Sequence, residues 1–393
     1  MTRETELPLS PEFRLLAAAL RPPTQAESAV ALVQASAGAL DWAHVLRLAE
    51  RHRVVPGLAA GIARAGVDVP APHGDRLRDG LALAAFQELA LAGTTKRILR
   101  SLTDAGIEVA VLKGVPLSLI IHGRLGLRTS RDIDLIVAPD AVARALEILE
   151  GEDFQPIEPV GKGGLRALIR HRKDIELISP HGGQIVELHW RLFDNPYLMP
   201  LVDAPAFASV SLPLEISCLT LPARFNLLYL ANHGAQHAWS RLKWLADLAA
   251  LLHPLGEAGR EALYAGTSIA EGRRSLGQAL LLCADLFGMP PPPGVLRDIR
   301  RDWRLRWLHR QAIGLLTRSA DREIESIPFG STAKNFSHYL ILSAPRYLVA
   351  EAAFDFTQFS SDERRSGWHL LGPIGRLSTW LKRKGRPAGK SQE

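Results

Sequence analysis

The first feature of the sequence that could carry chemistry is the pair Asp132 and Asp134, in the run Arg-Asp-Ile-Asp-Leu-Ile-Val. Side chains alternate between the two faces of a β-strand, so both carboxylates would point the same way, about 7 Å apart, with Ile133 and Leu135 toward the core. Two such carboxylates repel each other, and a divalent cation that prefers oxygen ligands, Mg²⁺ or Mn²⁺, relieves the repulsion. The pattern is also typical of an edge strand with a solvated acidic face, and the pair alone does not decide between these interpretations.

Lys113 and Gly114 form a candidate phosphate-binding turn upstream of the two aspartates. A strand-like run from Ile107 ends at these residues and leads directly into a helix that has Pro116 in its first turn. Glycine lets a ligand approach the backbone, the helix N-terminus offers free N–H groups, and lysine adds a positive charge. We therefore expect phosphate groups to bind at this turn.

Glu187 is a candidate third carboxylate. It lies in Ile-Val-Glu-Leu-His-Trp, an alternating run that we expect to pair beside the aspartate strand. Three carboxylates around one or two metal ions, next to a phosphate-binding turn, suit phosphoryl or nucleotidyl transfer. His189 shares the face of Glu187, and it either contacts metal or substrate or is an ordinary half-buried histidine.

His233 and His237 are spaced by one helical turn, which is a geometry able to bind Zn²⁺. The protease pattern His-Glu-x-x-His requires glutamate at position 234, where this chain has Gly234. We expect these histidines to form hydrogen bonds where two domains meet and not to bind metal.

The elements that must position these residues change in character along the chain. Helical periodicity dominates up to about residue 103, including Pro11–Leu20, a helix capped by Asp41 and a long Ala/Leu-rich helix that ends before Gly106. Strands are predicted from Ile107, at 132–137, at 174–179 and at 184–190, with a helix over 139–149 and a hairpin turn at Gly182-Gly183. Helical periodicity returns from Leu221. The class is therefore α+β, a small mixed sheet with helices inside an otherwise helical chain.

This organisation predicts four regions. They are an N-terminal helical region (1–105), an α/β core (106–215), a helical domain (216–290) and a C-terminal helical, basic region (291–393) with a frayed tail that contains Lys382-Arg383-Lys384. In the last region we expect a single cationic helix from Arg297 to Arg310. It could contact nucleic acid, but a solvated helix face anchored by its tryptophans is the favoured interpretation.

Composition excludes several classes of protein. With 393 residues, 47% hydrophobic and 22% charged, the chain is not disordered, collagen-like or a coiled coil. Its net charge of +6 is too diffuse to indicate a dedicated nucleic-acid binder. Two cysteines, no signal peptide and no apolar run of about 18 residues predict a soluble, cytoplasmic protein that does not contact membranes.

At the residues described above, the sequence resembles a known family. Lys-Gly, a helix, Arg-x-x-Arg-Asp-Ile-Asp-Leu and then Val-Glu-Leu-His-Trp resemble the bacterial uncharacterised nucleotidyltransferase family, a branch of the DNA polymerase β-like nucleotidyltransferase superfamily. Segments on either side, which begin at Asp41 and at Ala231, resemble flanking segments of these proteins, so the resemblance covers about residues 10 to 255.

The resemblance implies a nucleotidyltransferase-type sheet and a role for each matching residue. Asp132 and Asp134 would be paired ligands of Mg²⁺ or Mn²⁺, and Glu187 the third carboxylate, as metal ligand or as general base. Lys113 and Gly114, at the place where the superfamily usually has Gly-Ser, would hold the triphosphate of ATP or another NTP. The two remaining candidates, Arg128 and Arg131, either contact triphosphate oxygens or neutralise the two aspartates in the apo protein.

The implied reaction is the transfer of an NMP from an NTP to an acceptor hydroxyl with release of pyrophosphate. The acceptor would be a small molecule, a peptide or a protein. A toxin-type transferase acting on RNA ends and a non-catalytic nucleotide-binding or interaction protein on the same fold are the alternatives. The sequence determines neither the acceptor nor the oligomeric state.

Overall fold

A computed structural model describes residues 9–22, 25–38, 40–158, 164–200, 207–212, 215–317 and 330–366. The predicted C-terminal tail with Lys382 lies outside these residues. Within them, no helix combines the length and the apolar character needed to cross a lipid bilayer.

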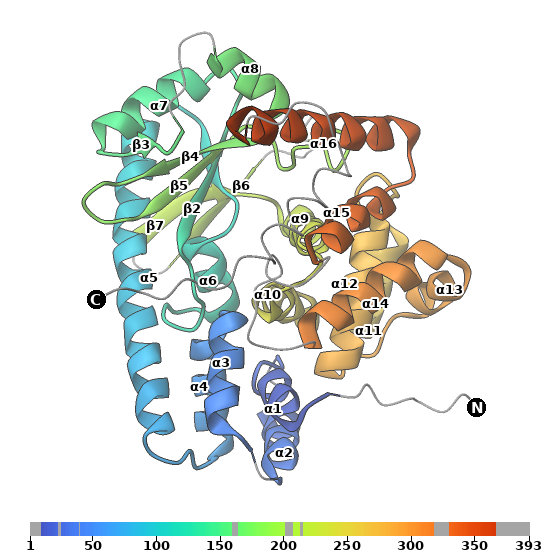
Figure 1. Cartoon of the computed structure of the whole chain (residues 1–393). Helices are drawn as coiled ribbons and strands as arrows, with labels where there is room; N and C mark the ends of the chain where they lie inside the picture. The colour runs from blue at the N-terminus through green and yellow to red at the C-terminus, as the bar shows by residue number, and fades with distance from the viewer. Residues whose placement is uncertain are drawn as a thin grey trace.

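Helices make up the N-terminal part of the chain, in the lower part of Figure 1. They are α1 (Pro11–Ala19), α2 (Gln25–Ser36), α3 (Trp42–Arg51), α4 (Val55–Ala65) and α5 (His73–Asp104). As predicted, the Asp41 side chain caps α3, accepting a hydrogen bond from the His44 backbone N–H at 3.0 Å. The left-handed conformation of Gly106 (φ 75°) after the end of α5 is also confirmed. The long α5 connects this helical part to the sheet (Figure 1).

A mixed sheet of seven strands follows, in the order β3-β4-β5-β2-β1-β7-β6. The strands are β1 (Val109–Val111), β2 (Asp132–Val137), β3 (Gln155–Pro156), β4 (Asp174–Ile178), β5 (Ile185–His189), β6 (Ala208–Leu212) and β7 (Ile216–Thr220), and the intervening helices are α6 (Val115–His122), α7 (Val142–Gly151) and α8 (Gly164–His171). The β2–β5 and β1–β7 pairs are parallel and the other pairs antiparallel. The predicted α+β class, with a mixed sheet flanked by helices, is confirmed.

The two faces of β2 have different partners. Ile133 and Leu135 are buried in an apolar core together with residues of α5 and α7. The opposite face carries Asp132 and Asp134, which Cβ alternation puts on one side. The predicted direction of both pairs of side chains is therefore confirmed.

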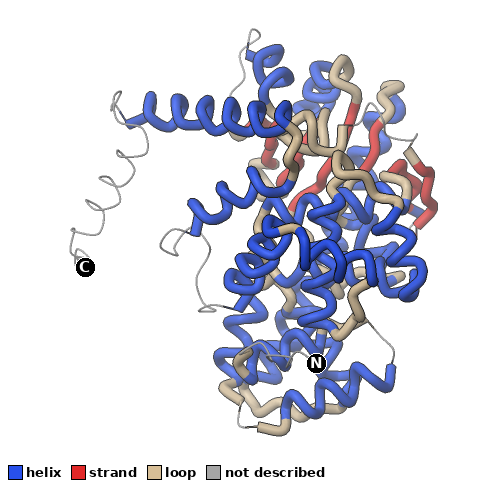
Figure 2. Tube along the Cα trace, turned by 90° about the vertical axis from the view of Figure 1, so that its right-hand side faces the viewer, coloured by secondary structure: helices blue, strands red, loops and turns tan. Residues whose placement is uncertain are grey.

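The C-terminal part is helical and lies beside the sheet (Figures 1 and 2). It contains α9 (Ala223–Gln236), α10 (Leu242–Leu252), a 3₁₀ turn η3 (His253–Leu255), α11 (Gly256–Ala265), α12 (Arg273–Phe287), α13 (Pro293–Arg301), α14 (Trp303–Thr317), α15 (Gly330–Ile341) and α16 (Pro345–Ser366). Helices α9 to α14 share a large apolar core with α1, α3 and α4.

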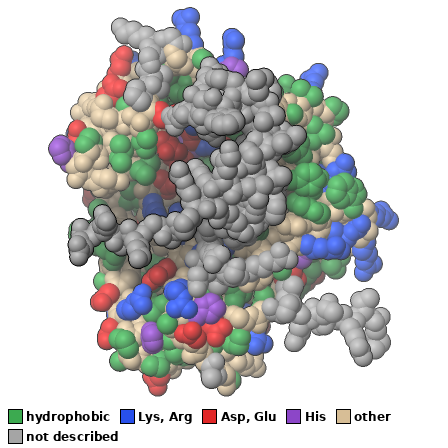
Figure 3. Space-filling model, viewed as in Figure 1, with side chains coloured by type: hydrophobic (Ala, Val, Ile, Leu, Met, Phe, Trp, Pro, Cys, Tyr) green, Lys and Arg blue, Asp and Glu red, His purple; other side chains and the backbone are tan. Residues whose placement is uncertain are grey.

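The prediction of one cationic helix from Arg297 to Arg310 is wrong, because the chain forms α13 and α14 there. Asp302 lies between the two helices, and its side chain accepts a hydrogen bond from the Arg304 backbone N–H at 2.9 Å. It therefore caps the N-terminus of α14. The predicted solvated face is present, since basic side chains gather at the edge of the molecule over α13 (Figure 3). The prediction also missed α8, β3, β6 and β7, and β7 lies beyond the boundary that we drew at residue 215. The division into four regions stays a prediction.

Gly234 in α9 illustrates how tightly this part is packed. A Cβ at this position would lie 2.4 Å from ring atoms of Trp239, whose side chain is fully buried. We predict that Gly234→Ala destabilises the protein by about 1–3 kcal/mol through overpacking and lowers its melting temperature. Gly93→Ala in α5 is the matched control, because nothing lies within 4 Å of its added Cβ. It should raise the melting temperature through its higher helix propensity. Equal melting temperatures for the two variants would contradict the close packing of Trp239 on Gly234.

Candidate active site

Strand register gathers polar side chains on one face of the sheet. The parallel β2–β5 ladder aligns Asp134 with Glu187. The antiparallel β4–β5 ladder aligns Glu176 with Glu187 and Asp174 with His189. Because aligned residues of neighbouring strands share a face, these five side chains form one polar surface.

Asp134 lies at the centre of this surface and is fully buried, with 0% of its side chain exposed. Its Oδ1 atom is 2.7 Å from Nζ of Lys113, the residue next to the turn at Gly114. Burial by itself would raise the pKa of Asp134, but the Lys113 ammonium and His189 hold it well below its ordinary value. Lys113 is therefore the counter-charge of Asp134, a contact that the predicted role toward triphosphate did not include.

His189 lies between two carboxylates. Its Nε2 atom is 3.2 Å from Glu187 Oε2 and 3.6 Å from Asp134 Oδ1, and 2% of its side chain is exposed. Burial and Lys173 act to lower the pKa of His189, but the carboxylates of Asp134 and Glu187 outweigh them and raise it. The histidine therefore belongs to the polar cluster and is not an ordinary half-buried side chain.

Asp134, Glu187 and His189 could hold a metal ion. Each offers one ligand atom, and these atoms lie within 4.8 Å of one another. Oδ2 of Asp134 is buried and has no hydrogen-bond partner among the described residues, so it has an unused lone pair. A mixed set of carboxylate oxygens and imidazole nitrogen suits a divalent cation. This set differs from the expected one, since His189 is in it and Asp132 is not.

A cavity of about 470 Å³ lies in front of the cluster. Of the residues expected to act there, Lys113, Arg128, Asp132 and Glu187 line it. Asp134, Gly114 and Arg131 are not among the described lining residues: Asp134 is buried behind them and Arg131 is exposed. Gly114 precedes α6 with φ 74°, a conformation that favours glycine, and a Cβ there would lie 3.4 Å from the carbonyl oxygen of Asp132. The turn therefore packs closely against the start of β2.

Among the described residues, Arg128 forms hydrogen bonds with groups other than the carboxylates of Asp132 and Asp134. Its Nε donates to Asp247 Oδ2 at 2.9 Å, and its NH1 donates to the Gly114 carbonyl oxygen at 3.2 Å and to Ser130 Oγ at 2.7 Å. The guanidinium is buried and links α10 to the turn before α6. In this structure it positions the turn.

Rings from α9 and α10 line the opposite side of the cavity. The ring centroid of Trp244 lies 5.6 Å from that of His233 and 4.8 Å from that of His237. Burial, followed by nearby cations, lowers the pKa of both histidines well below the ordinary value. Among the described residues no third ligand joins them in a candidate metal group. Their rings pack on Trp244, and within the described part of the chain no side-chain hydrogen bond to another domain is found for them.

Several lining residues were absent from the sequence-based candidates. They are Arg172, Lys173, Asp174, Glu176, Asp194 and Tyr229. The run Asp-Ile-Glu at 174–176 has the same alternation as Asp-Ile-Asp and could have identified two of them. Of the others, Arg172 and Lys173 precede β4, Asp194 follows β5 and Tyr229 lies on α9, and nothing in their local sequence places them at this cavity.

Comparisons with known proteins identify a family that this chain matches. A family model described as uncharacterised nucleotidyltransferase matches residues 38–288. A search of curated proteins found no match. Among solved structures, the antibiotic-resistance factor ANT(2'')-Ia is similar at 15% sequence identity, over 43% of this chain and 85% of that chain, with a TM-score of 0.31. A TM-score this low indicates only a weak similarity of fold, so the family match is the finding that bears on function.

The buried pair of Lys113 and Asp134 generates a stability prediction. Lys113→Met leaves a buried carboxylate without its counter-charge and should lower the free energy of unfolding by about 3–5 kcal/mol. Asp134→Asn in the same chain removes the stranded charge and should restore part of that loss. Chemical denaturation of both single variants and the double variant measures the coupling. Strictly additive losses would show that the two side chains do not interact.

Proposed function

This chain belongs to the uncharacterised nucleotidyltransferase family, and from that premise we propose that it transfers an NMP from an NTP to an acceptor hydroxyl and releases pyrophosphate. The observation that carries the proposal is the β2–β5 register, which aligns Asp134 with Glu187 on the face that also bears Asp132. That face lies at a cavity whose lining includes many basic side chains. Carboxylates for a cation and basic groups for phosphates are what this reaction needs.

Asp132, Asp134 and Glu187, with His189, are the residues that would hold Mg²⁺ or Mn²⁺. For Asp134, Glu187 and His189, the support is that their ligand atoms lie within 4.8 Å of one another and that Oδ2 of Asp134 has no hydrogen-bond partner among the described residues. For Asp132, the support is its place on the same face of β2 and on the lining of the cavity. A cation bound there supplies positive charge for the phosphates and for the charge that develops during transfer. In its absence the Lys113 ammonium offsets the charge of Asp134.

Basic groups on the cavity wall would bind the triphosphate. The described basic residues on its lining are Arg53, Lys113, Arg128, Arg172, Lys173, Arg241, Lys243 and Lys334. The Gly114 turn would offer backbone N–H groups at the start of α6, and we retain Arg131 as a contact from the exposed side. Arg128 would act indirectly, since its hydrogen bond to the Gly114 carbonyl holds the turn in place.

Glu187 would accept the proton of the acceptor hydroxyl. Its side chain is 20% exposed, unlike that of Asp134, so it can reach a substrate in the cavity. As the hydroxyl oxygen forms a bond to the α-phosphorus, the bond from that phosphorus to pyrophosphate breaks and the proton passes to Glu187. His189, 3.2 Å away, would orient the carboxylate.

The size of the cavity favours a compact acceptor. About 470 Å³ is within the usual range for small-molecule sites. We therefore propose a small molecule or the side chain of a peptide or protein as acceptor, in preference to an RNA end.

Free cysteines support a reducing, cytoplasmic location for the reaction. Cys218 and Cys283 are both buried and unpaired. Burial raises the pKa of Cys218 to about 11 and that of Cys283 to about 12, so both thiols stay protonated.

Loss of the metal ligands should abolish nucleotide-dependent stabilisation. At a hundredfold excess over its dissociation constant, NTP with Mg²⁺ should stabilise the protein by about 2.7 kcal/mol. We predict that Asp132→Asn removes this stabilisation, measured as the shift in melting temperature with and without Mg²⁺. An unchanged shift in the variant would remove Asp132 from the metal site.

Glu187→Gln should separate binding from catalysis. The variant keeps the size of the side chain but cannot accept a proton, so NTP should still bind while label transfer from α-³²P NTP falls about 100-fold or more. Glu176→Gln is the matched control, because it makes the same change on the strand aligned with Glu187 and should retain transfer. Normal turnover by Glu187→Gln would exclude it as the base, and no transfer by the unmodified protein to any RNA, protein or small-molecule acceptor would favour a non-catalytic role.

A further inference from the structure

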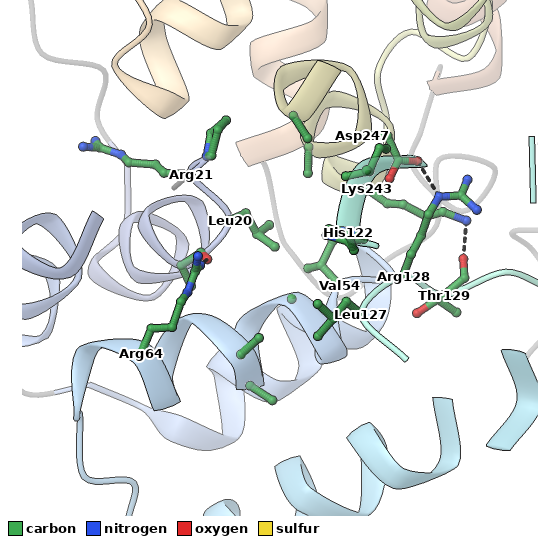
Figure 4. A pocket seen from close by; sticks show the side chains of 18 of the residues that line it. Leu20, Arg21, Val54, Arg64, His122, Leu127, Arg128, Thr129, Lys243 and Asp247 are labelled. Carbon is green, nitrogen blue, oxygen red and sulfur yellow. Dashed lines mark hydrogen bonds and ion pairs between the residues drawn. The ribbon is translucent and has the colours of Figure 1, made fainter. Parts of the chain in front are cut away.

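A second and larger cavity, of about 820 Å³, lies among α1, α4, the loop after α6 and α10. Figure 4 shows it from close by: Arg21 and Arg64 lie on one side, Lys243 and Arg128 on the other, and Leu20, Val54 and Leu127 between them. Most of these residues have no role in the proposed transfer reaction. The cavity is therefore a candidate site for another ligand.

Basic side chains outnumber acidic ones in the described lining of this cavity. Its described Arg and Lys residues are Arg21, Arg53, Arg64, Arg124, Arg128 and Lys243, and Asp247 is its one described carboxylate. Asp247 is already the partner of Arg128, with Oδ2 and Nε 2.9 Å apart. An anion would thus find several basic groups that no carboxylate of the lining neutralises.

Lys243 is the basic group best placed to bind that anion. It is 9% exposed, and its ammonium donates a hydrogen bond to the carbonyl oxygen of Thr129, as Figure 4 shows. It makes no ion pair with a described residue. Burial and the neighbouring Arg128 lower the pKa of Lys243 to about 7, although the carboxylates of Asp247 and Asp132 act in the opposite direction, so its charge is only partly compensated. An anion in the cavity would compensate that charge where water screens it least.

The rest of the lining is mostly apolar, which favours a ligand that carries an apolar group beside its anionic one. Apart from the charged residues and His122, Thr129 and His253, the described lining is aliphatic, with Leu20, Val54, Leu81, Ile121 and Leu127 as its larger side chains. An alkyl or aryl group would pack against these walls, and the removal of apolar surface from water would favour its binding.

We propose that this cavity binds a small amphipathic anion, a carboxylate or phosphate ester on an apolar body, with the anionic group at Lys243. The site is distinct from the cavity proposed for NTP, although Arg53, Arg128 and Lys243 line both. Arg128 also donates a hydrogen bond to the Gly114 carbonyl, so the ligand would sit next to a group that holds the proposed phosphate turn. Binding does not depend on transfer activity and can be tested without a nucleotide.

Calorimetric titration of the full chain with decanoate and with decyl phosphate, both below their micelle concentrations, tests the proposal. We expect at least one to bind, and neutral decanol to bind about tenfold more weakly or worse, because a charge-assisted contact is lost. Binding of decanoate alone or of decyl phosphate alone distinguishes the two head groups. Decanol binding as tightly as the anions, or the absence of binding by both anions, would overturn the proposal.

Variants locate the binding in this cavity. Ala60→Phe on α4 and Ala250→Phe on α10 each fill it from a different wall and line only this cavity. Either one that keeps the melting temperature of the unmodified protein should lose binding. Lys243→Met should fold, because it removes a poorly compensated buried charge, and should weaken binding of the anion about tenfold or more while leaving that of decanol unchanged.

Glu187→Gln is the control, since it alters a residue that lines only the other cavity and should bind the amphiphile normally. Unchanged affinity in the folded cavity-filling variants or in Lys243→Met would overturn the assignment. Because Glu187→Gln tests the proposed transferase site, failure of that function and failure of this site are separate results.

Discussion

The buried carboxylate of Asp134 is the constraint on which the candidate active site depends. A charge with no solvent exposure must be compensated nearby, and Lys113 does this from just beyond the end of β1, the strand next to β2. That requirement fixes the end of β1, and with it the turn at Gly114, close to the start of β2. The parallel pairing with β5 then brings Glu187 and His189 to the same carboxylate. The charge of Asp134 on β2 is thus compensated by residues at the two neighbouring strands, β1 and β5.

A second buried network holds the loop between α6 and β2. Arg128 reaches Asp247, the Gly114 carbonyl and Ser130, while Glu88 of α5 accepts a hydrogen bond from the Gly126 backbone N–H at 2.6 Å. Burial raises the pKa of Glu88, with the hydrogen bond from Gly126 and nearby Arg128 acting against that rise. These contacts tie the long helix α5, the loop and α10 together, so the shape of the turn at Gly114 depends on these helices.

The same network separates two cavities of different chemistry. On one side, carboxylates and basic groups intermix around the sheet, as suits a cation and phosphates together. On the other, basic groups surround apolar walls with one carboxylate among the described residues, and that carboxylate is already paired. Arg128 and Lys243 belong to both linings. The two cavities are therefore neighbours that share these side chains, and they differ in the chemistry of their remaining walls.

The sequence alone determined the local features. Alternation in the run around Asp132 and Asp134 predicted the strand and its two faces, Gly182-Gly183 predicted the β4–β5 hairpin, and Asp41 predicted a helix start, because each depends on residues close together in the chain. It also identified the carboxylates of β2 and β5. Tertiary structure decided which charges meet: Lys113 with Asp134, Arg128 with Asp247, and His189 with Asp134 and Glu187 in a group that could hold a metal ion. Those partners depend on strand register, on helix packing and on the burial that makes an unpaired charge costly, and none of these can be read from local spacing.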